Sequence, residues 1–116
     1  MTNRPFDDKC PIGRAAQVFG DACTLMILRD LFRDGTRKFR DFDAKDRGFS
    51  PKTVSARLKS LVDRGYVQTA LYQDHPPRYH YSLTDQGRAL GPVMTAMYNW
   101  AGGTPDYVPP SQRSLT

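Results

Sequence analysis

Hydroxyl groups and positive charges gather on one face of an expected helix that begins at Ser50 and Pro51. Serine before proline favours a helix start, because the serine oxygen accepts amide hydrogen bonds and proline has no amide hydrogen to lose. Apolar residues at helical spacing predict a buried stripe that runs to about Asp63, made of Val54, Leu58, Leu61 and Val62. The exposed face then carries Lys52, Thr53, Ser55, Ala56, Arg57, Lys59 and Ser60. Side chains of these kinds can hydrogen-bond phosphate oxygens and base edges in a DNA groove.

Within this face, small residues would let the helix approach bases closely. We expect Arg57 to pair with guanine, and Lys52 or Lys59 to hold phosphates. The helix start at Ser50 would also point its positive end toward the duplex. The alternative is an ordinary amphipathic helix with a polar outer face.

A second candidate site is the turn between two segments of alternating polarity, 66–72 and 78–83, which predict a β-hairpin. Pro76 and Pro77 stiffen the turn, and Arg78 follows directly, which suits contact with a phosphate or a narrow minor groove. The alternative is a plain hairpin with a surface arginine. Lys38 and Arg40 are further basic candidates for DNA contact.

Positive charge is concentrated in the same part of the chain. The 116 residues carry a formal net charge of +5, and between Arg37 and Arg64 nine lysines and arginines accompany only four aspartates. The rest of the chain is balanced, so the whole excess lies in one quarter of the protein. This distribution is typical of an electrostatic footprint for nucleic acid, although a solvated basic surface would give the same count.

The elements that must position these residues follow from periodicity and from helix caps. In chain order we expect helices at 11–19 and 21–33, a short strand at 37–38, helices at 39–45 and 51–63, the hairpin, and a helix at 85–101 that Pro92 kinks or displaces. The predicted fold class is mainly α with a small β-hairpin (α+β), a winged helix-turn-helix with extra N- and C-terminal helices. We expect a flexible arm at 1–9, one domain at 10–102 and a disordered tail at 103–116.

The last expected helix carries more apolar surface than one small domain needs, which predicts a homodimer. Its stripe consists of Leu90, Val93, Met94, Met97 and Tyr98, with Trp100 at the edge.

The two cysteines are too few for a disulfide scaffold. Cys10 precedes Pro11 at a helix start, where the helix dipole stabilises a thiolate, and it is a candidate redox residue; the alternative is an unreactive thiol in the arm. Cys23 stands in an apolar helix and is expected in the core.

Catalytic and metal sites are not expected. His75 and His80 have no neighbouring cysteine or glutamate to complete a zinc site, and we see no nucleophile elbow or glycine-rich phosphate loop. We therefore predict no enzyme activity, no cofactor and no metal. The chain has no apolar run long enough for a membrane span and no apolar signal core at its start, so a cytoplasmic location is expected.

Motifs along most of the chain resemble the HxlR-type winged helix-turn-helix regulators, relatives of the MarR group. These motifs are Cys10-Pro11, Gly20, Leu28-Arg-Asp-Leu31, Gly35, Lys38-Phe39, the run from Ser50 to Leu58, Leu61, Gly65, Pro76-Pro-Arg78, Tyr81-Ser-Leu-Thr84, Gly87, Leu90 and Trp100. The sequence departs from the family pattern at Cys23, where an aromatic residue is usual, and conservatively at Lys38-Phe39 and Asp41-Phe42.

The resemblance implies a dimeric transcription factor that contacts double-stranded DNA through the Ser50 helix and the wing. It adds the first helix, with Ile12 and Phe19, to the dimer interface. It also implies that a cysteine at the place of Cys10 senses oxidants or electrophiles in some members, so a small-molecule or oxidant effector is expected. The alternative function is a winged-helix protein-interaction module without specific DNA binding, which would require an apolar outer face on the Ser50 helix.

Overall fold

Side-chain caps set the starts of four helices in the computed structural model, which describes residues 9–42 and 48–102. Helix α1 (Pro11–Phe19) is capped by the Cys10 sulfur and α2 (Ala22–Asp34) by the Asp21 carboxylate. Helix α3 (Pro51–Asp63) is capped by Ser50 and α4 (Asp85–Arg88) by Thr84. Each cap accepts a hydrogen bond from a backbone N–H in the first turn, where helix donors have no partner within the helix.

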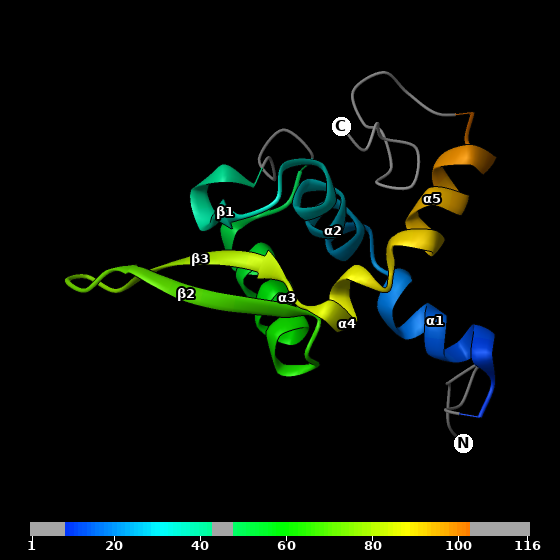
Figure 1. Ribbon diagram of the computed structural model, residues 1–116, viewed down its shortest axis with the longest axis horizontal. Helices are drawn as coiled ribbons and strands as arrows, with labels where there is room; N and C mark the ends of the chain where they lie inside the picture. Colours follow the sequence, from blue (N-terminus) through cyan, green and yellow to red (C-terminus); the bar gives the residue numbers. More distant parts are fainter. Residues whose placement is uncertain (1–8, 43–47, 103–116) are drawn as a thin grey trace.

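Helix α2 lies at the centre of the molecule, between α3 with the hairpin on one side and α1 with α5 (Gly91–Trp100) on the other (Figure 1). Its side chains Ile27, Leu28 and Leu31 are buried. They pack in one core with these residues of α3 and the hairpin base: Val54, Leu58, Leu61, Val67 and Leu83. The dense apolar pattern of this helix therefore reflects contacts on several sides.

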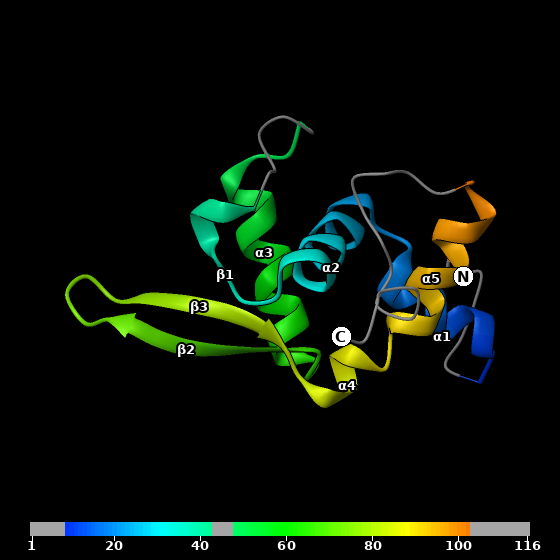
Figure 2. The ribbon, with the colours of Figure 1, turned by 45° about the horizontal axis from the view of Figure 1, so that its top comes forward.

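The sheet has three antiparallel strands in the order β1-β3-β2: β1 (Arg37–Lys38), β3 (Arg78–Leu83) and β2 (Val67–Gln73). Val67 pairs with Leu83 at the buried base, and the exposed pair Leu71 and Tyr79 lies further out along the same face. The β2–β3 hairpin extends away from the helices, as Figures 1 and 2 show from two directions. It forms the wing, and the predicted winged helix-turn-helix fold is confirmed.

The expected final helix is divided in two. Helix α4 ends at Arg88, and α5 begins at Gly91 with Pro92 in its first turn. Proline is tolerated in a first turn because that amide needs no partner within the helix, so Pro92 displaces the helix start and does not kink its interior. Gly91 is buried beside Phe32, where a Cβ would be in van der Waals contact with the ring, 3.4 Å from Cε1.

The expected helix at 39–45 is represented by a short 3-10 turn, η1 (Phe39–Asp41), followed by the extended residue Phe42. Phe42 is buried and packs edge-on against Tyr81, with ring centroids 6.2 Å apart. The remainder of that expected helix lies outside the described residues, as do residues 1–8 of the arm expected at 1–9 and the tail expected at 103–116. No helix within residues 9–42 and 48–102 is long and apolar enough to cross a membrane.

Candidate nucleic-acid interface

The first turn of α3 has an exposed outer face, and a side-chain cap holds its backbone. Ser50 Oγ accepts a hydrogen bond from the Thr53 amide at 3.1 Å and lies 3.0 Å from Thr53 Oγ1. Of the residues predicted to contact DNA on this helix, Thr53 and Arg57 are half-buried, and the others are exposed: Ser50, Pro51, Lys52, Ser55, Ala56, Lys59 and Ser60. Since the opposite face packs on α2, the polar face points outward as the sequence predicts.

Arg57 is bonded to the start of α2. Its Nε donates to Asp21 Oδ2 at 3.0 Å, and the same oxygen accepts hydrogen bonds from the Thr24 amide at 2.9 Å and the Thr24 hydroxyl at 3.0 Å. One carboxylate oxygen therefore caps α2 and holds the middle of α3. The expected pairing of Arg57 with guanine stays a prediction; the structure places Arg57 Nε on Asp21.

The protonation of Asp21 reflects these contacts. Burial pushes the pKa of its carboxyl upward, but the hydrogen bonds from Thr24 and Arg57 outweigh burial and leave the pKa below its ordinary value. The hydrogen bond and charge of Asp21 in turn raise the pKa of the Arg57 guanidinium. Both groups are consequently charged at neutral pH.

A second link joins α3 to the first helix. Arg64, at the end of α3, donates from Nη1 to the backbone oxygen of Gln17 in α1 at 3.0 Å. On the outer face, Lys59 Nζ lies 2.7 Å from Asp63 Oδ2 in an exposed ion pair. Because both partners are in solvent, a phosphate can compete for the Lys59 ammonium at little cost.

Two basic residues predicted to contact DNA border the same depression, Arg78 on the wing and Arg40 on η1. Arg78 at the start of β3 and Arg40 on η1 are exposed and line one small depression of about 180 Å³, together with Tyr72 and Tyr79. At the tip, Gln73 Nε2 donates to the backbone oxygen of Pro76 at 3.1 Å. Both guanidinium groups are thus placed on the part of the surface formed jointly by η1 and the hairpin.

Lys38 has a more defined position than its sequence suggests. Its Nζ lies 4.7 Å from the centroid of the Tyr72 ring, and that ring stacks on His80 with centroids 4.6 Å apart. The backbone amide of Lys38 donates to Asp41 Oδ2 at 3.1 Å, which fixes η1 to β1. The stacking of Tyr72 on His80 beneath Lys38 was not predicted. The alternation of the expected hairpin places both rings on one face, and this is the only indication of the contact in the sequence.

The two cysteines differ in access. Cys10 is half-buried, and its Sγ accepts a hydrogen bond from the Gly13 amide at 3.4 Å. Cys23 is 1% exposed, which confirms that it belongs to the core. Burial, followed by the charge of Asp21, raises the pKa of the Cys23 thiol, so that this sulfur stays protonated and unreactive at neutral pH.

The apolar residues expected at a dimer interface fall into three groups. Three are well exposed: Ile12 at 66%, Val93 at 41% and Trp100 at 89%. Met94 is only 6% exposed and belongs to the core of this chain. The others pack partly against that core: Phe19, Leu90, Met97 and Tyr98.

Among the described residues, no group of three histidine, cysteine or acidic side chains is placed to hold a metal ion.

Comparison with known proteins extends these findings. The model of the HxlR-like helix-turn-helix family matches residues 18–108. The HTH-type transcriptional regulator sll1512 of Synechocystis is 36% identical over 89 residues, which are 77% of this chain and 65% of the relative. Rv3095 of Mycobacterium tuberculosis, also named an HTH-type transcriptional regulator, is 35% identical over 98 residues, 84% of this chain and 59% of the relative. The matched part of the chain therefore spans about three fifths of these relatives.

Solved structures of bacterial regulators have the same fold as this chain. The oxidized redox regulator HypR superposes with a TM-score of 0.70 at 25% identity, covering 91% of this chain and all of HypR. A MarR-family transcriptional regulator of Porphyromonas gingivalis has a TM-score of 0.72 at 27% identity and covers 84% of this chain and 94% of its own. Reduced YodB of Bacillus subtilis has a TM-score of 0.61 at 27% identity and covers 79% and 90%. The family and its relatives are named as regulators and not as enzymes, and the chain belongs to the HxlR-like helix-turn-helix family.

Proposed function

We propose that the protein is a sequence-specific, DNA-binding transcriptional regulator that acts as a homodimer. The single observation that carries this proposal is the exposed start of α3, where hydroxyl and basic side chains surround a capped helix N-terminus. A helix with this surface can enter a major groove, contact bases with its first two turns and direct its amides at phosphates. Because chromosomal DNA is the proposed partner, the proposal includes a cytoplasmic location.

The wing supports the proposal with a second contact. Arg40 and Arg78 border one depression on η1 and the hairpin, where they would neutralise backbone phosphates beside the groove that α3 occupies. The hydroxyl-rich, charged face of α3 disfavours the alternative of a protein-interaction module, since such a module would present an apolar surface there.

The proposed dimer forms through α1 and α5. Ile12 and Trp100 are large apolar side chains left in solvent on these terminal helices, and a second copy would cover them. A twofold axis would then repeat α3 at the spacing of half-sites, about 34–36 Å along the duplex.

We further propose that an oxidant or electrophile acts through Cys10. HypR is named a redox regulator, and one solved structure of YodB is of the diamide-treated protein. In this chain Cys10 is the accessible thiol of the described residues, whereas Cys23 is enclosed in the core. Modification of Cys10 would remove the cap of α1, and with it one of the contacts that orient the proposed dimer helix.

DNA selection followed by quantitative binding tests the main proposal. A random duplex pool should yield an enriched two-part sequence, and Lys52→Ala should weaken binding to it while Arg14→Ala, an exposed change on α1, does not. Failure to enrich any sequence, or equal loss with both variants, would refute specific binding by α3.

The proposed thiol response needs a separate measurement. A quinone, whose ring carbon forms a covalent bond with a single thiolate, should release the DNA from wild-type protein and from Cys23→Ser, but not from Cys10→Ser. Release that persists in Cys10→Ser would assign the response to another group.

A further inference from the structure

A depression of about 320 Å³ lies between α3 and the hairpin. Ser55 and Lys59 of α3 border it on one side, and Thr69, Tyr79 and Tyr81 of the hairpin border it on the other. The two α3 residues belong to the face that the sequence predicts for DNA contact. The three hairpin residues are not among the predicted DNA contacts, and each of them carries a hydroxyl group.

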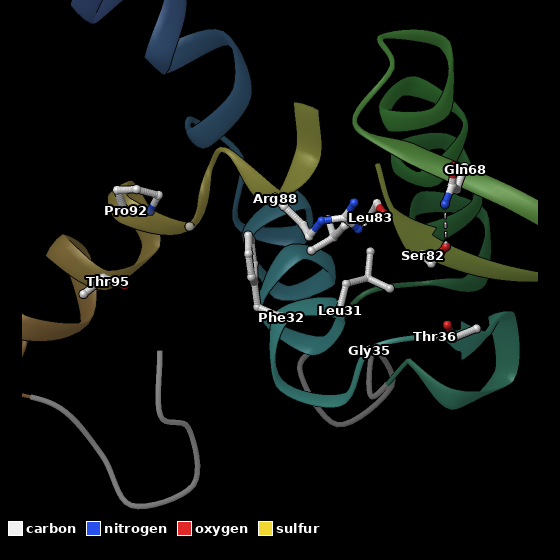
Figure 3. Close-up of a pocket in the computed structure, with 11 residues that line it drawn as sticks. Leu31, Phe32, Gly35, Thr36, Gln68, Ser82, Leu83, Arg88, Pro92 and Thr95 are labelled. Carbon is white, nitrogen blue, oxygen red and sulfur yellow. Dashed lines mark hydrogen bonds between the residues drawn. The ribbon is translucent and has the colours of Figure 1, made fainter. Parts of the chain in front are cut away.

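Strand pairing turns these hairpin residues toward α3. Thr69 pairs with Tyr81, and Tyr79 lies two residues before Tyr81, so all three share one face of the sheet. The neighbouring pair, Gln68 and Ser82, belongs to the opposite face and lines the cavity shown in Figure 3. The three hydroxyl-bearing side chains are therefore on the face of the wing that lies nearest to α3.

The lining offers hydrogen-bond donors and a positive charge. Within the described part of the chain, no hydrogen bond joins the hydroxyls of Ser55, Thr69 or Tyr79 to another protein group, and all three residues are exposed. Burial, followed by the neighbouring Tyr79, raises the pKa of the Tyr81 hydroxyl, which therefore stays a donor at neutral pH. The Lys59 ammonium, whose ion pair is in solvent, supplies the charge. None of the described residues that line the depression is acidic.

The depression adjoins the one that Arg40 and Arg78 border. Tyr79 and Tyr81 line both of them. Positive charge is thus present on either side of the two tyrosines, with Lys59 on α3 and the two arginines on η1 and the wing. Phosphates follow one another at about 3.4 Å of helix axis along each DNA strand, so one strand could bring successive phosphates to the two depressions.

The geometry of duplex DNA indicates what crosses this part of the surface. With α3 in the major groove and the wing at the adjacent minor groove, one sugar-phosphate strand must pass between them. We propose that the depression binds a sugar-phosphate unit of that strand, whose phosphate is held by Lys59 and by the hydroxyls of Thr69 and Tyr79. This inference rests on the proposed function and deepens it, because a phosphate held by both elements fixes the position of the wing relative to α3 on the duplex.

The test compares variants that each lose one hydroxyl group. Tyr79→Phe should weaken binding of the full chain to a random-sequence duplex and to the enriched duplex alike, by about tenfold, since every duplex offers the same phosphate. The slope of log affinity against log salt should stay unchanged, because the hydroxyl is neutral. Tyr66→Phe is the matched control, because Tyr66 precedes β2 at the base of the hairpin and borders neither depression. Wild-type affinity in a folded Tyr79→Phe, or a loss confined to the enriched duplex, would overturn the phosphate contact.

A scan of the duplex locates the phosphate. Each phosphate of the enriched duplex is replaced in turn by a neutral methylphosphonate. At one position the replacement should weaken binding of wild type about tenfold and of Tyr79→Phe by a smaller factor, because the variant has already lost that contact. Equal losses in both proteins at every position would overturn the proposal. Thr69→Val, which removes a hydroxyl and keeps the shape of the side chain, decides in the same scan if circular dichroism shows that Tyr79→Phe does not fold.

The results separate this site from the proposed function. Wild type that binds no duplex refutes both. Enrichment of a sequence, together with no effect of Tyr79→Phe, refutes the phosphate site alone. Weaker binding of Tyr79→Phe to the random duplex, in a protein that enriches no sequence, supports the site and refutes sequence-specific binding.

Discussion

Replacing Asp21 should separate its two roles, as the cap of α2 and as the partner of Arg57. Asp21→Ala removes the acceptor of the Thr24 amide, and loss of an N-cap costs about 1 kcal/mol of unfolding free energy. For a chain of this size, that cost lowers Tm by roughly 4 °C. Asp21→Asn keeps an oxygen that can cap the helix, so we expect it to be the milder change. The Asp21–Arg57 pair is largely in solvent, and its own contribution should be small.

The assay is urea unfolding followed by circular dichroism at one fixed protein concentration, because a dimer makes stability depend on concentration. The lowered pKa of Asp21 adds a pH dependence with a definite sign. The stabilisation from its charge is present above the ordinary pKa of about 3.9 and is lost as the pH falls through the lower folded value. The difference between wild type and Asp21→Asn should therefore shrink below about pH 4. If Asp21→Asn destabilises as strongly as Asp21→Ala at pH 7, the charge and not the cap dominates, and the reasoning is wrong.

Three further predictions concern the wing, the proposed interface and the packing of α4. Arg78→Ala should weaken binding to any duplex and reduce the slope of log affinity against log salt by about one, whereas Arg14→Ala should leave the slope unchanged. An unaltered slope in Arg78→Ala would exclude the wing from the DNA contact. Sedimentation should find wild type at twice the 13.1 kDa chain mass and Trp100→Glu closer to one chain, because a charge replaces an 89% exposed apolar ring; a monomeric wild type contradicts the dimer. Gly87→Ala should cost about 1–3 kcal/mol in urea unfolding, since its Cβ would lie 2.1 Å from the Tyr66 backbone oxygen, and a neutral effect would show that this backbone can move.

Features set by neighbouring residues were predictable from the sequence. The caps Asp21 and Ser50 each accept a hydrogen bond from an amide only three residues further along the chain. Pro92 moves a helix start because its ring excludes it from a helix interior. The alternation of the hairpin segments likewise gives the face on which Leu83 is buried.

Features that depend on how distant segments meet were not predictable. Arg57 and Asp21 are 36 residues apart, and nothing local indicates that they share a hydrogen bond. Similarly, Met94 and Val93 are adjacent apolar residues, and only the angle of α5 decides that the first is buried and the second exposed. The division of the interface candidates into core and surface therefore required the packed structure.

Two side-chain links join α3 to the N-terminal helices in addition to its buried packing on α2. Arg57 bonds the cap of α2, and Arg64 bonds the backbone of α1; the two arginines are seven residues apart, about two helical turns. A rotation or tilt of α3 would therefore have to break one of these bonds as well as the packing. Each exposed bond contributes little by itself, so the links favour one position of α3 and do not lock it there. A displacement of α1 would act on the far end of α3 through the Arg64 bond.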